Sequence, residues 1–151
     1  MTTVLTYGTF DLFHYGHVRL LKRLQELGDR LVVGLSSDEF NALKGKKTII
    51  PYEHRREILL ACRYVDHVFS ENNWQQKPND IEREKADIFA MGDDWVGKFD
   101  DLSELTEVIY LPRTRGISTT DVKQFAQAQH ADKVREIKFL TEQLSEKMSR
   151  L

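Results

Sequence analysis

Residues 3–24 limit the choice of fold more than any other part of this sequence. They begin with a short apolar run rich in β-branched and aromatic residues, and Gly8 interrupts that run. From Val18 onward, leucine residues recur at helical spacing as Leu20, Leu21 and Leu24. The segment therefore predicts a strand, a glycine turn and an amphipathic helix, in that order.

Two histidines lie where this helix is expected to begin. His14 and His17 are three residues apart, so they share one face of the first turn, and Gly16 between them leaves the backbone uncovered. The N–H groups and the positive dipole of a helix N-terminus attract anions. A single histidine would more often be a partly buried side chain with satisfied hydrogen bonds. The pair, placed directly after a strand, favours a phosphate site.

The composition is typical of one small domain without a strong charge. The 151 residues carry a net charge of −2, and the basic residues form no block, so bulk charge gives no reason to expect nucleic acid or an anionic membrane as partner. The single cysteine, Cys62, follows apolar residues of an amphipathic segment, which favours a buried thiol in a reducing compartment. We find no transmembrane or signal segment. We therefore expect a cytoplasmic protein that does not insert into membranes.

Strand-like and helix-like segments alternate along the rest of the chain. Short apolar runs, typical of strands in a parallel sheet, occupy residues 30–36, 66–69, 87–91 and 108–111. Helical segments separate them, so the sequence predicts an α/β fold with a Rossmann-like five-stranded parallel sheet and helices on both faces. Right-handed crossovers in such sheets allow few topologies, and among them we expect the strand order 3-2-1-4-5. The loops after strands 1, 4 and 5 then meet at the sheet edge where ligands bind.

Polar residues follow the last two of these strands. Asp93 and Asp94 could be metal ligands, a general acid/base pair or a turn with a helix cap. Because neighbouring side chains point in different directions, we expect one functional carboxylate, Asp94. After the fifth strand and a glycine turn, hydroxyl side chains offer a second helix N-terminus to phosphates. They belong to Ser118, Thr119 and Thr120.

Several cations in the loops have two interpretations. Lys44, Lys46 and Lys47 surround one glycine, and the sequence alone favours a solvated loop and an anion site about equally. Arg55 and Arg63 are eight residues apart on a helix expected over residues 51–64, roughly 80° around its axis, so both can lean to one side. An exposed ion pair is the ordinary role of such a residue. For Arg63 we favour phosphate binding.

Two motifs resemble the signatures of a known enzyme family. Residues 7–17, Y-G-T-F-D-L-F-H-Y-G-H, resemble the opening motif of the HxGH nucleotidyltransferases. Residues 113–120, R-T-R-G-I-S-T-T, resemble the second signature of their cytidylyltransferase branch. Shorter matches lie between them in the same order. The resemblance implies transfer of CMP from CTP to a phosphorylated alcohol, with sn-glycerol 3-phosphate as the expected acceptor. The alternatives are transfer of CMP to another polyol phosphate or to phosphoethanolamine, or a nucleotide-binding module that catalyses no reaction.

The resemblance also implies roles for individual residues. The catalytic group comprises His14, His17, Lys46 and Arg113. These four would also bind CTP, together with Gly8, Thr9, Phe10, Asp94, Thr114, Gly116, Ile117, Ser118, Thr119 and Thr120. The acceptor group comprises Lys44, Arg55, Arg63, Trp74 and Lys77. Trp74 lies in a polar loop, where it could be either a lid or a packing anchor. A Mg²⁺ ion that bridges the phosphates is expected, with Asp11 or Asp94 as a possible ligand.

The last part of the chain has a different pattern. From His130 onward, apolar residues recur at spacings of three and four, which predicts an amphipathic helix over residues 130–151 beyond a domain of residues 1–129. Residues 147–150, K-M-S-R, resemble a signature of class I aminoacyl-tRNA synthetases. We interpret that likeness as a coincidence, because Met148 continues the apolar stripe of the helix. An apolar stripe is poorly tolerated in water, so we expect it to pack on its own protomer or in a homodimer.

Overall fold

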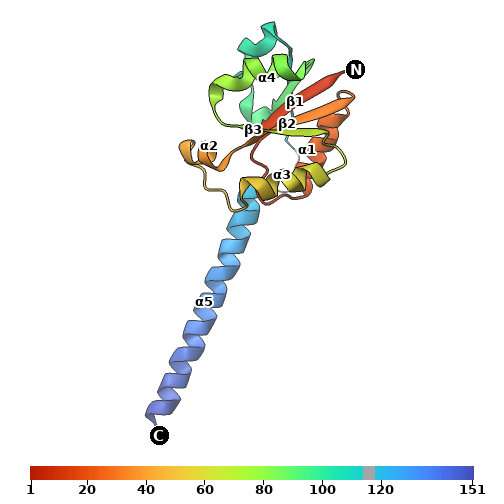
Figure 1. Ribbon diagram of the computed structural model, residues 1–151. Coiled ribbons are helices and arrows are strands. Elements are labelled where there is room, and N and C mark those ends of the chain that lie inside the picture. Colours follow the sequence, from red (N-terminus) through yellow and green to blue (C-terminus); the bar gives the residue numbers. More distant parts are fainter. Residues whose placement is uncertain (114–117) are drawn as a thin grey trace. The chain divides into compact units, whose positions relative to one another are not determined.

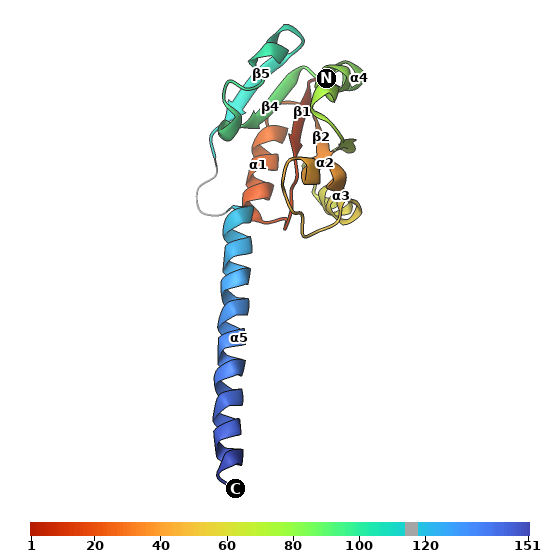
Figure 2. The same cartoon turned by 90° about the vertical axis from the view of Figure 1, so that its left-hand side faces the viewer.

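The computed structural model describes residues 1–113 and 118–151. Five parallel strands form one sheet in the order β3-β2-β1-β4-β5, which confirms the predicted topology; β3, β2 and β1 are labelled in Figure 1, and β4 and β5 in Figure 2. Their bounds lie within one or two residues of the predicted ones. The strands are β1 (Thr3–Gly8), β2 (Arg30–Ser36), β3 (His67–Glu71), β4 (Ile88–Gly92) and β5 (Glu107–Leu111).

Helices and short 3₁₀ turns connect the strands. The α-helices are α1 (Tyr15–Gln25), α2 (Asp38–Leu43), α3 (Tyr52–Ala61), α4 (Lys77–Glu84) and α5 (Thr119–Ser149). The 3₁₀ turns are η1 (Trp74–Gln76), η2 (Asp93–Trp95) and η3 (Asp100–Glu104). Helix α3 ends three residues before the predicted position, and this difference bears on Arg63 below.

Apolar side chains cover both faces of the sheet. One core cluster joins the strands to Leu21 and Leu24 of α1 and to Leu59 of α3. The other joins them to Ile81 of α4 and Leu102 of η3. Figure 2 shows α1 beside the sheet. Successive residues of a strand point to opposite faces of the sheet. Because both faces are covered here, both sets of side chains are apolar, which explains the continuous apolar runs in the sequence.

Gly34 in β2 leaves room for the aromatic ring of Tyr7 on the neighbouring strand. A Cβ atom at this position would come within 2.4 Å of the Tyr7 ring. Without that atom, Tyr7 on β1 reaches toward α4, and its hydroxyl donates a 2.7 Å hydrogen bond to the Asp80 carboxylate. Burial, reinforced by Asp80, raises the pKa of Tyr7 well above its usual value, so the phenol keeps its proton. The ring of Tyr7 thereby gains a fixed place at the carboxyl edge of the sheet.

Helix α5 is a separate unit, which comprises residues 118–151, while residues 1–117 form the first unit. Ser118 caps the helix: its hydroxyl accepts a hydrogen bond from the Asp121 N–H, and the Asp121 carboxylate accepts one from the Ser118 N–H. The helix is continuous over 31 residues, so the predicted boundary between residues 129 and 130 falls inside it. Met148 lies on this helix, as the sequence predicted. None of the helices in the described residues is long and apolar enough to cross a bilayer.

Candidate active site

A pocket opens at the carboxyl edge of the sheet and has a cavity volume of about 80 Å³. Residues that end or follow four of the strands line it. Six of the predicted site residues are among them: Gly8, Thr9, Lys44, Lys46, Trp74 and Lys77. The parallel topology thus brings together side chains that are far apart in the sequence, as expected for the edge where ligands bind in such folds.

Two lysines of this pocket are held by hydrogen bonds and by aromatic rings. The Lys44 ammonium donates to the Ser36 hydroxyl at 3.2 Å and lies 4.3 Å from the centre of the Phe40 ring. The Lys77 ammonium donates to the Glu71 carboxylate at 2.8 Å and lies over the Tyr7 ring. Cations in such partly desolvated surroundings attract an anion more strongly than cations in water do. The pocket is therefore suited to a phosphate group.

Three aromatic side chains form one wall of the pocket. Trp74 lies 6.1 Å from Trp95, measured between ring centres, and Trp95 lies 5.4 Å from Phe99. Trp74 remains 45% exposed and also lies over the ammonium of Lys77. Its position answers the question that the sequence left open, because Trp74 packs in the wall of the pocket.

The two histidines form the N-terminus of α1. Their rings stack with centres 3.9 Å apart. The Nδ1 atom of His14 accepts a hydrogen bond from the Gly16 N–H, and the Nδ1 atom of His17 accepts one from the His14 N–H. Each Nδ1 is therefore unprotonated, and the proton of the neutral ring is on Nε2. The motif thus caps its own helix and keeps the Nε2–H groups as donors.

Burial keeps both imidazoles neutral. It lowers the pKa of His17 to about 4, with a smaller contribution from His14, and it also lowers the pKa of His14. Phe10 and Phe13 pack on the His17 ring at 5.3 and 5.5 Å between ring centres. Phe10 itself has a positive φ of 49°, an uncommon conformation for an aromatic residue, so the turn before the helix is tightly constrained. At neutral pH the pair therefore supplies hydrogen-bond donors without a positive charge.

Titration of His17 should make stability depend on pH. Because its pKa is about 4 in the folded chain and about 6.5 in an unfolded one, the folded state binds fewer protons between these values. Stability should be complete above pH 6.5 and fall as the pH drops toward 4, by up to about 3 kcal/mol. Denaturant unfolding at several pH values measures this. In His17→Phe the free energy of unfolding should fall less over the same pH range. An identical fall would contradict the lowered pKa of His17.

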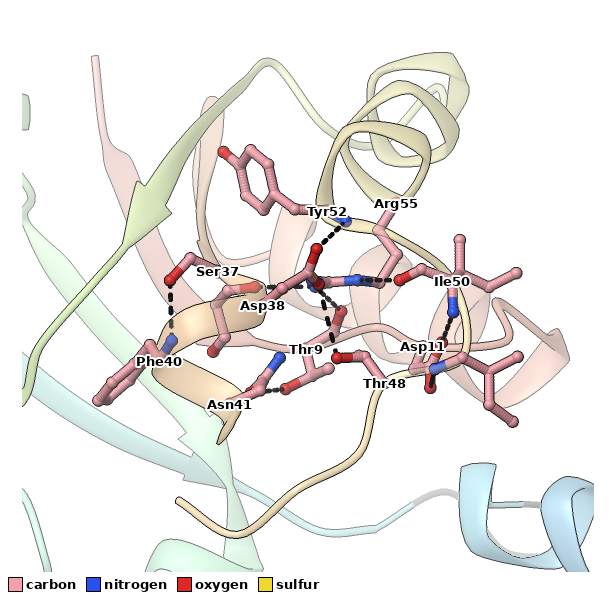
Figure 3. A network of polar contacts seen from close by, with 12 residues as sticks. Thr9, Asp11, Ser37, Asp38, Phe40, Asn41, Thr48, Ile50, Tyr52 and Arg55 are labelled. Atoms are coloured by element: carbon pink, nitrogen blue, oxygen red, sulfur yellow. Dashed lines mark hydrogen bonds and ion pairs between the residues drawn. The ribbon is translucent and has the colours of Figure 1, made fainter. Parts of the chain in front are cut away.

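Arg55 has a structural role, and its burial argues against the predicted role in acceptor binding. The side chain is 1% exposed, and all three guanidinium nitrogens donate hydrogen bonds within the chain (Figure 3). The acceptors are the carbonyls of Ile50, Thr9 and Ser36 and the carboxylate of Asp38, at 2.7–2.9 Å. Arg55 thereby ties together the loops that follow β1 and β2.

Asp11 also holds a loop in place. Its carboxylate accepts hydrogen bonds from the N–H groups of Ile49 and Ile50 at 2.9 Å and from that of Leu12 at 3.1 Å. The side chain is buried. A carboxylate that already satisfies three backbone donors is a poor metal ligand, so the structure argues against Asp11 as the Mg²⁺ ligand. Its position instead fixes the segment that follows Lys46.

Arg63 lies away from the pocket, contrary to the prediction. Helix α3 ends at Ala61, so Arg63 belongs to the turn that leads into β3 and does not extend the helix face of Arg55. It is exposed at the amino end of β3, whereas the pocket lies at the carboxyl ends of the strands. The prediction assumed a helix three residues longer than the observed one.

Comparison with known proteins agrees with this geometry. Residues 5–125 match a family model described as cytidylyltransferase-like. The chain belongs to the cytidylyltransferase-like family. It is 58% identical to glycerol-3-phosphate cytidylyltransferase from Bacillus subtilis (strain 168) over 82% of this chain and 96% of that protein. It is 55% identical to the protein of the same name from Staphylococcus aureus, over 82% of this chain and 94% of that protein.

A solved structure shares the fold of this cytidylyltransferase-like chain. The lipopolysaccharide core biosynthesis protein from Thermoplasma volcanium superposes with a TM-score of 0.65 and 25% sequence identity. The match covers 76% of this chain and 98% of that one. Since the family model ends at residue 125, most of helix α5 lies beyond the family match.

Other residues predicted for the cytidylyltransferase-like site do not line the pocket, belong to the unit of α5, or lie outside the described part. Asp94 is exposed on η2, and the N–H of the exposed Arg113 donates to Asp93 at 3.3 Å. Ser118, Thr119 and Thr120 belong to the unit of α5. The predicted CTP-binding residues Thr114, Gly116 and Ile117 lie outside the described residues. Within residues 1–113 and 118–151, no group of three His, Cys, Asp or Glu side chains could hold a metal.

The sequence did not single out several residues that line the pocket. They are Tyr7, Ser36, Glu71, Met91, Trp95 and Phe99. Ser36 and Glu71 are the last residues of β2 and β3, so a signal was present in the sequence. The rule that ligands bind at the carboxyl ends of parallel strands identifies such positions once the strand bounds are known.

Proposed function

We propose that the protein is a glycerol-3-phosphate cytidylyltransferase, which transfers CMP from CTP to sn-glycerol 3-phosphate and releases pyrophosphate. The CDP-glycerol product would supply the synthesis of teichoic acid or a related surface polymer. The observation that carries this proposal is a second candidate anion site beside the histidine pair: Lys44 and Lys77 line a pocket at the same sheet edge as the loop leading from β1 to that pair. A reaction between two phosphorylated substrates needs two such sites. The names of the bacterial relatives support the choice of acceptor.

The reaction requires little covalent help from the protein. The second pKa of a phosphomonoester is near 6, so the acceptor is already mostly a dianion at pH 7 and needs no general base. Its phosphate oxygen attacks the α-phosphorus of CTP, a new O–P bond forms, and the bond to the β-phosphate oxygen breaks as pyrophosphate leaves. Catalysis then consists of positioning the two anions and stabilising the charge that develops.

The proposed roles follow from the charge and protonation of each group. His14 and His17 donate from Nε2 to the α-phosphate, while Lys46 and Arg113 bind the triphosphate. Lys44 and Lys77 bind the acceptor phosphate. A Mg²⁺ ion bound with the nucleotide would neutralise charge on the phosphates. The protein donors fit a metal that takes most of its ligands from the nucleotide, with Asp94 as the candidate carboxylate.

A grid of substrates tests the function. Pyrophosphate release is measured for CTP, ATP, GTP and UTP, each with glycerol 3-phosphate, other polyol phosphates and phosphoethanolamine. We expect the highest kcat/KM for CTP with glycerol 3-phosphate, because the small pocket suits a small acceptor. A preference for ATP, or a tenfold preference for a bulkier acceptor, would contradict the proposal. Binding of CTP without any release of pyrophosphate would favour a non-catalytic nucleotide-binding module.

Lys44→Ala should raise KM for glycerol 3-phosphate at least tenfold and KM for CTP much less. The Lys44 ammonium lies in the acceptor pocket, and a hydrogen bond to a charged group contributes about 1.5–3 kcal/mol. Steady-state kinetics with each substrate varied in turn measures the two constants. Lys47→Ala is the matched control, since this exposed lysine of the same loop does not line the pocket. A larger effect on KM for CTP would show that Lys44 binds the nucleotide and not the acceptor.

The proposal also includes a cytoplasmic location and a homodimer, both of which stay predictions. Apolar side chains of the predicted stripe are exposed on α5, namely Val134, Ile137, Leu140, Leu144 and Met148, and Leu151 just beyond the helix is exposed too. Light scattering on the full chain and on a chain that ends at Gln129 tests whether α5 contributes to assembly. The same pair of chains shows whether the helix is dispensable for catalysis.

A further inference from the structure

Glu71 connects the two lysines of the acceptor pocket. It is the last residue of β3 and only 3% exposed. One of its carboxylate oxygens accepts a 2.8 Å hydrogen bond from the Lys77 ammonium, and the other accepts a 2.7 Å hydrogen bond from the Ser36 hydroxyl. The Ser36 hydroxyl in turn accepts a hydrogen bond from the Lys44 ammonium. A buried carboxylate therefore joins both ammonium groups into one network.

The side chains that line this pocket carry an excess of positive charge. Among the described residues, the charged side chains that line it are Lys44, Lys46, Lys77 and Glu71, and their excess of two positive charges faces both the acceptor and the triphosphate proposed to bind Lys46. A phosphomonoester carries nearly two negative charges at neutral pH. Without Glu71, three cations would face one another in a partly desolvated space, and their repulsion would act against a fixed arrangement.

We propose that Glu71 is a positioning residue for the acceptor, which holds Lys77 directly, and Lys44 through Ser36, in the arrangement that binds the acceptor phosphate. This inference rests on the proposed function. A lysine side chain has about 2 kcal/mol of rotamer entropy, and a lysine that is already held loses less of it when the phosphate binds. Glu71 thereby improves affinity for an acceptor that it does not itself need to contact.

A purely structural role explains Glu71 less well. A buried ion pair contributes little to stability compared with apolar side chains of the same size, because desolvation of both charges offsets their attraction. The pair of Glu71 and Lys77 lies in the wall of a cavity, and the Lys77 ammonium is surrounded there by the rings of Tyr7, Trp74 and Phe99. Such a position costs stability unless the charges have a ligand to bind.

Glu71 also controls the protonation of its neighbours. Burial lowers the pKa of Lys44, and the cations Lys46, Lys77 and Arg55 lower it further, while Glu71 acts in the opposite direction. Removal of the carboxylate charge should therefore let Lys44 lose its proton at a lower pH. The acceptor would then meet a neutral amine at a pH where the wild-type pocket is still charged.

Two substitutions separate the effect of the hydrogen bonds of Glu71 from the effect of its negative charge. Glu71→Ala removes both anchors, and we expect KM for glycerol 3-phosphate to rise at least tenfold while KM for CTP stays within twofold. Glu71→Gln keeps the size of the side chain and removes its charge. We expect this variant to shift the alkaline limb of kcat/KM for glycerol 3-phosphate to lower pH, an effect that a merely structural residue would not produce.

Glu84→Gln is the matched control. Glu84 at the end of α4 is also a largely buried carboxylate paired with basic groups, at 3.2 Å from Arg30 and 3.5 Å from His67. Those partners are the first residues of β2 and β3, at the edge of the sheet opposite the pocket. This variant should keep the wild-type KM values and the wild-type alkaline limb, even where its thermal stability falls.

A binding measurement separates this inference from the proposed function. Trp74 and Trp95 line the pocket, so their fluorescence reports binding of glycerol 3-phosphate without turnover. We expect Glu71→Ala to weaken this binding at least tenfold and Glu84→Gln to leave it unchanged. If the wild-type protein binds glycerol 3-phosphate but makes no CDP-glycerol, the proposed function fails and the role of Glu71 is still measured. Unchanged acceptor binding and an unchanged alkaline limb in the Glu71 variants, or equal rises in both KM values, would overturn the inference.

Discussion

Replacement of His14 or His17 by alanine should lower kcat about 10²–10³-fold and leave binding of CTP nearly unchanged. Each imidazole is neutral at pH 7 and carries its proton on Nε2, so in the proposed mechanism each would supply one donor to the charge that develops on the α-phosphate. Loss of one such donor costs about 2.7–4 kcal/mol of transition-state stabilisation. Because the interaction strengthens as charge develops, kcat should fall while KM for CTP changes little.

Stability must be followed in the same variants. His14 is the N-cap of α1, and loss of a cap costs about 1 kcal/mol, so circular dichroism should verify that each protein is folded at the assay temperature. His54→Ala is the control, since this histidine is exposed on α3 and does not line the pocket. Turnover at the wild-type rate in both His14→Ala and His17→Ala would show that the histidine pair has no role in catalysis.

The fold could be predicted almost completely from the sequence. Strands covered on both faces appear as continuous apolar runs, right-handed crossovers leave few possible orders, and the order 3-2-1-4-5 chosen among them is confirmed. The ends of helices were less certain. Helix α3 was expected to reach residue 64, and no side-chain pattern marks its end at Ala61.

The candidate site was predictable where chemistry depends on local sequence. The histidine pair and its helix N-terminus come from four consecutive residues, so their geometry follows from the motif. Arg55 shows where prediction from the sequence fails. Whether a guanidinium binds a phosphate or a set of carbonyl groups depends on the path of distant loops, and here Thr9 and Ser36 present their carbonyls to it. Sequence spacing contains no information about those contacts.

Glu71 is a residue whose role could not be predicted from the sequence for a different reason. A glutamate in a polar segment is ordinarily solvated, and only the pairing of β2 with β3 places it beside Ser36. Its partner Lys77 was predicted as an acceptor residue, and the carboxylate that holds it was not. Residues that act through a neighbour lack a motif of their own, so they are found from contacts and burial.

Arg55 carries the second large effect that we expect, and this effect is on stability. Its guanidinium is fully buried and pairs with Asp38 at 2.7 Å, besides three carbonyl acceptors (Figure 3). Those acceptors belong to three segments: the turn after β1, the end of β2 and the loop before α3. Without the arginine, buried carbonyl oxygens would lose their donors, and each unsatisfied polar group costs about 1–3 kcal/mol.

Arg55→Ala should therefore destabilise the fold by about 3–5 kcal/mol, the range for a buried ion pair that loses one partner, and lower Tm by about 10 °C. Thermal and urea unfolding measure the change. Arg56→Ala is the matched control, because this neighbouring arginine is exposed on the same helix and should change stability by no more than about 0.5 kcal/mol. If Arg55 instead bound the acceptor, Arg55→Ala would keep the wild-type Tm and raise KM for glycerol 3-phosphate, and that result would restore the role that the sequence suggested.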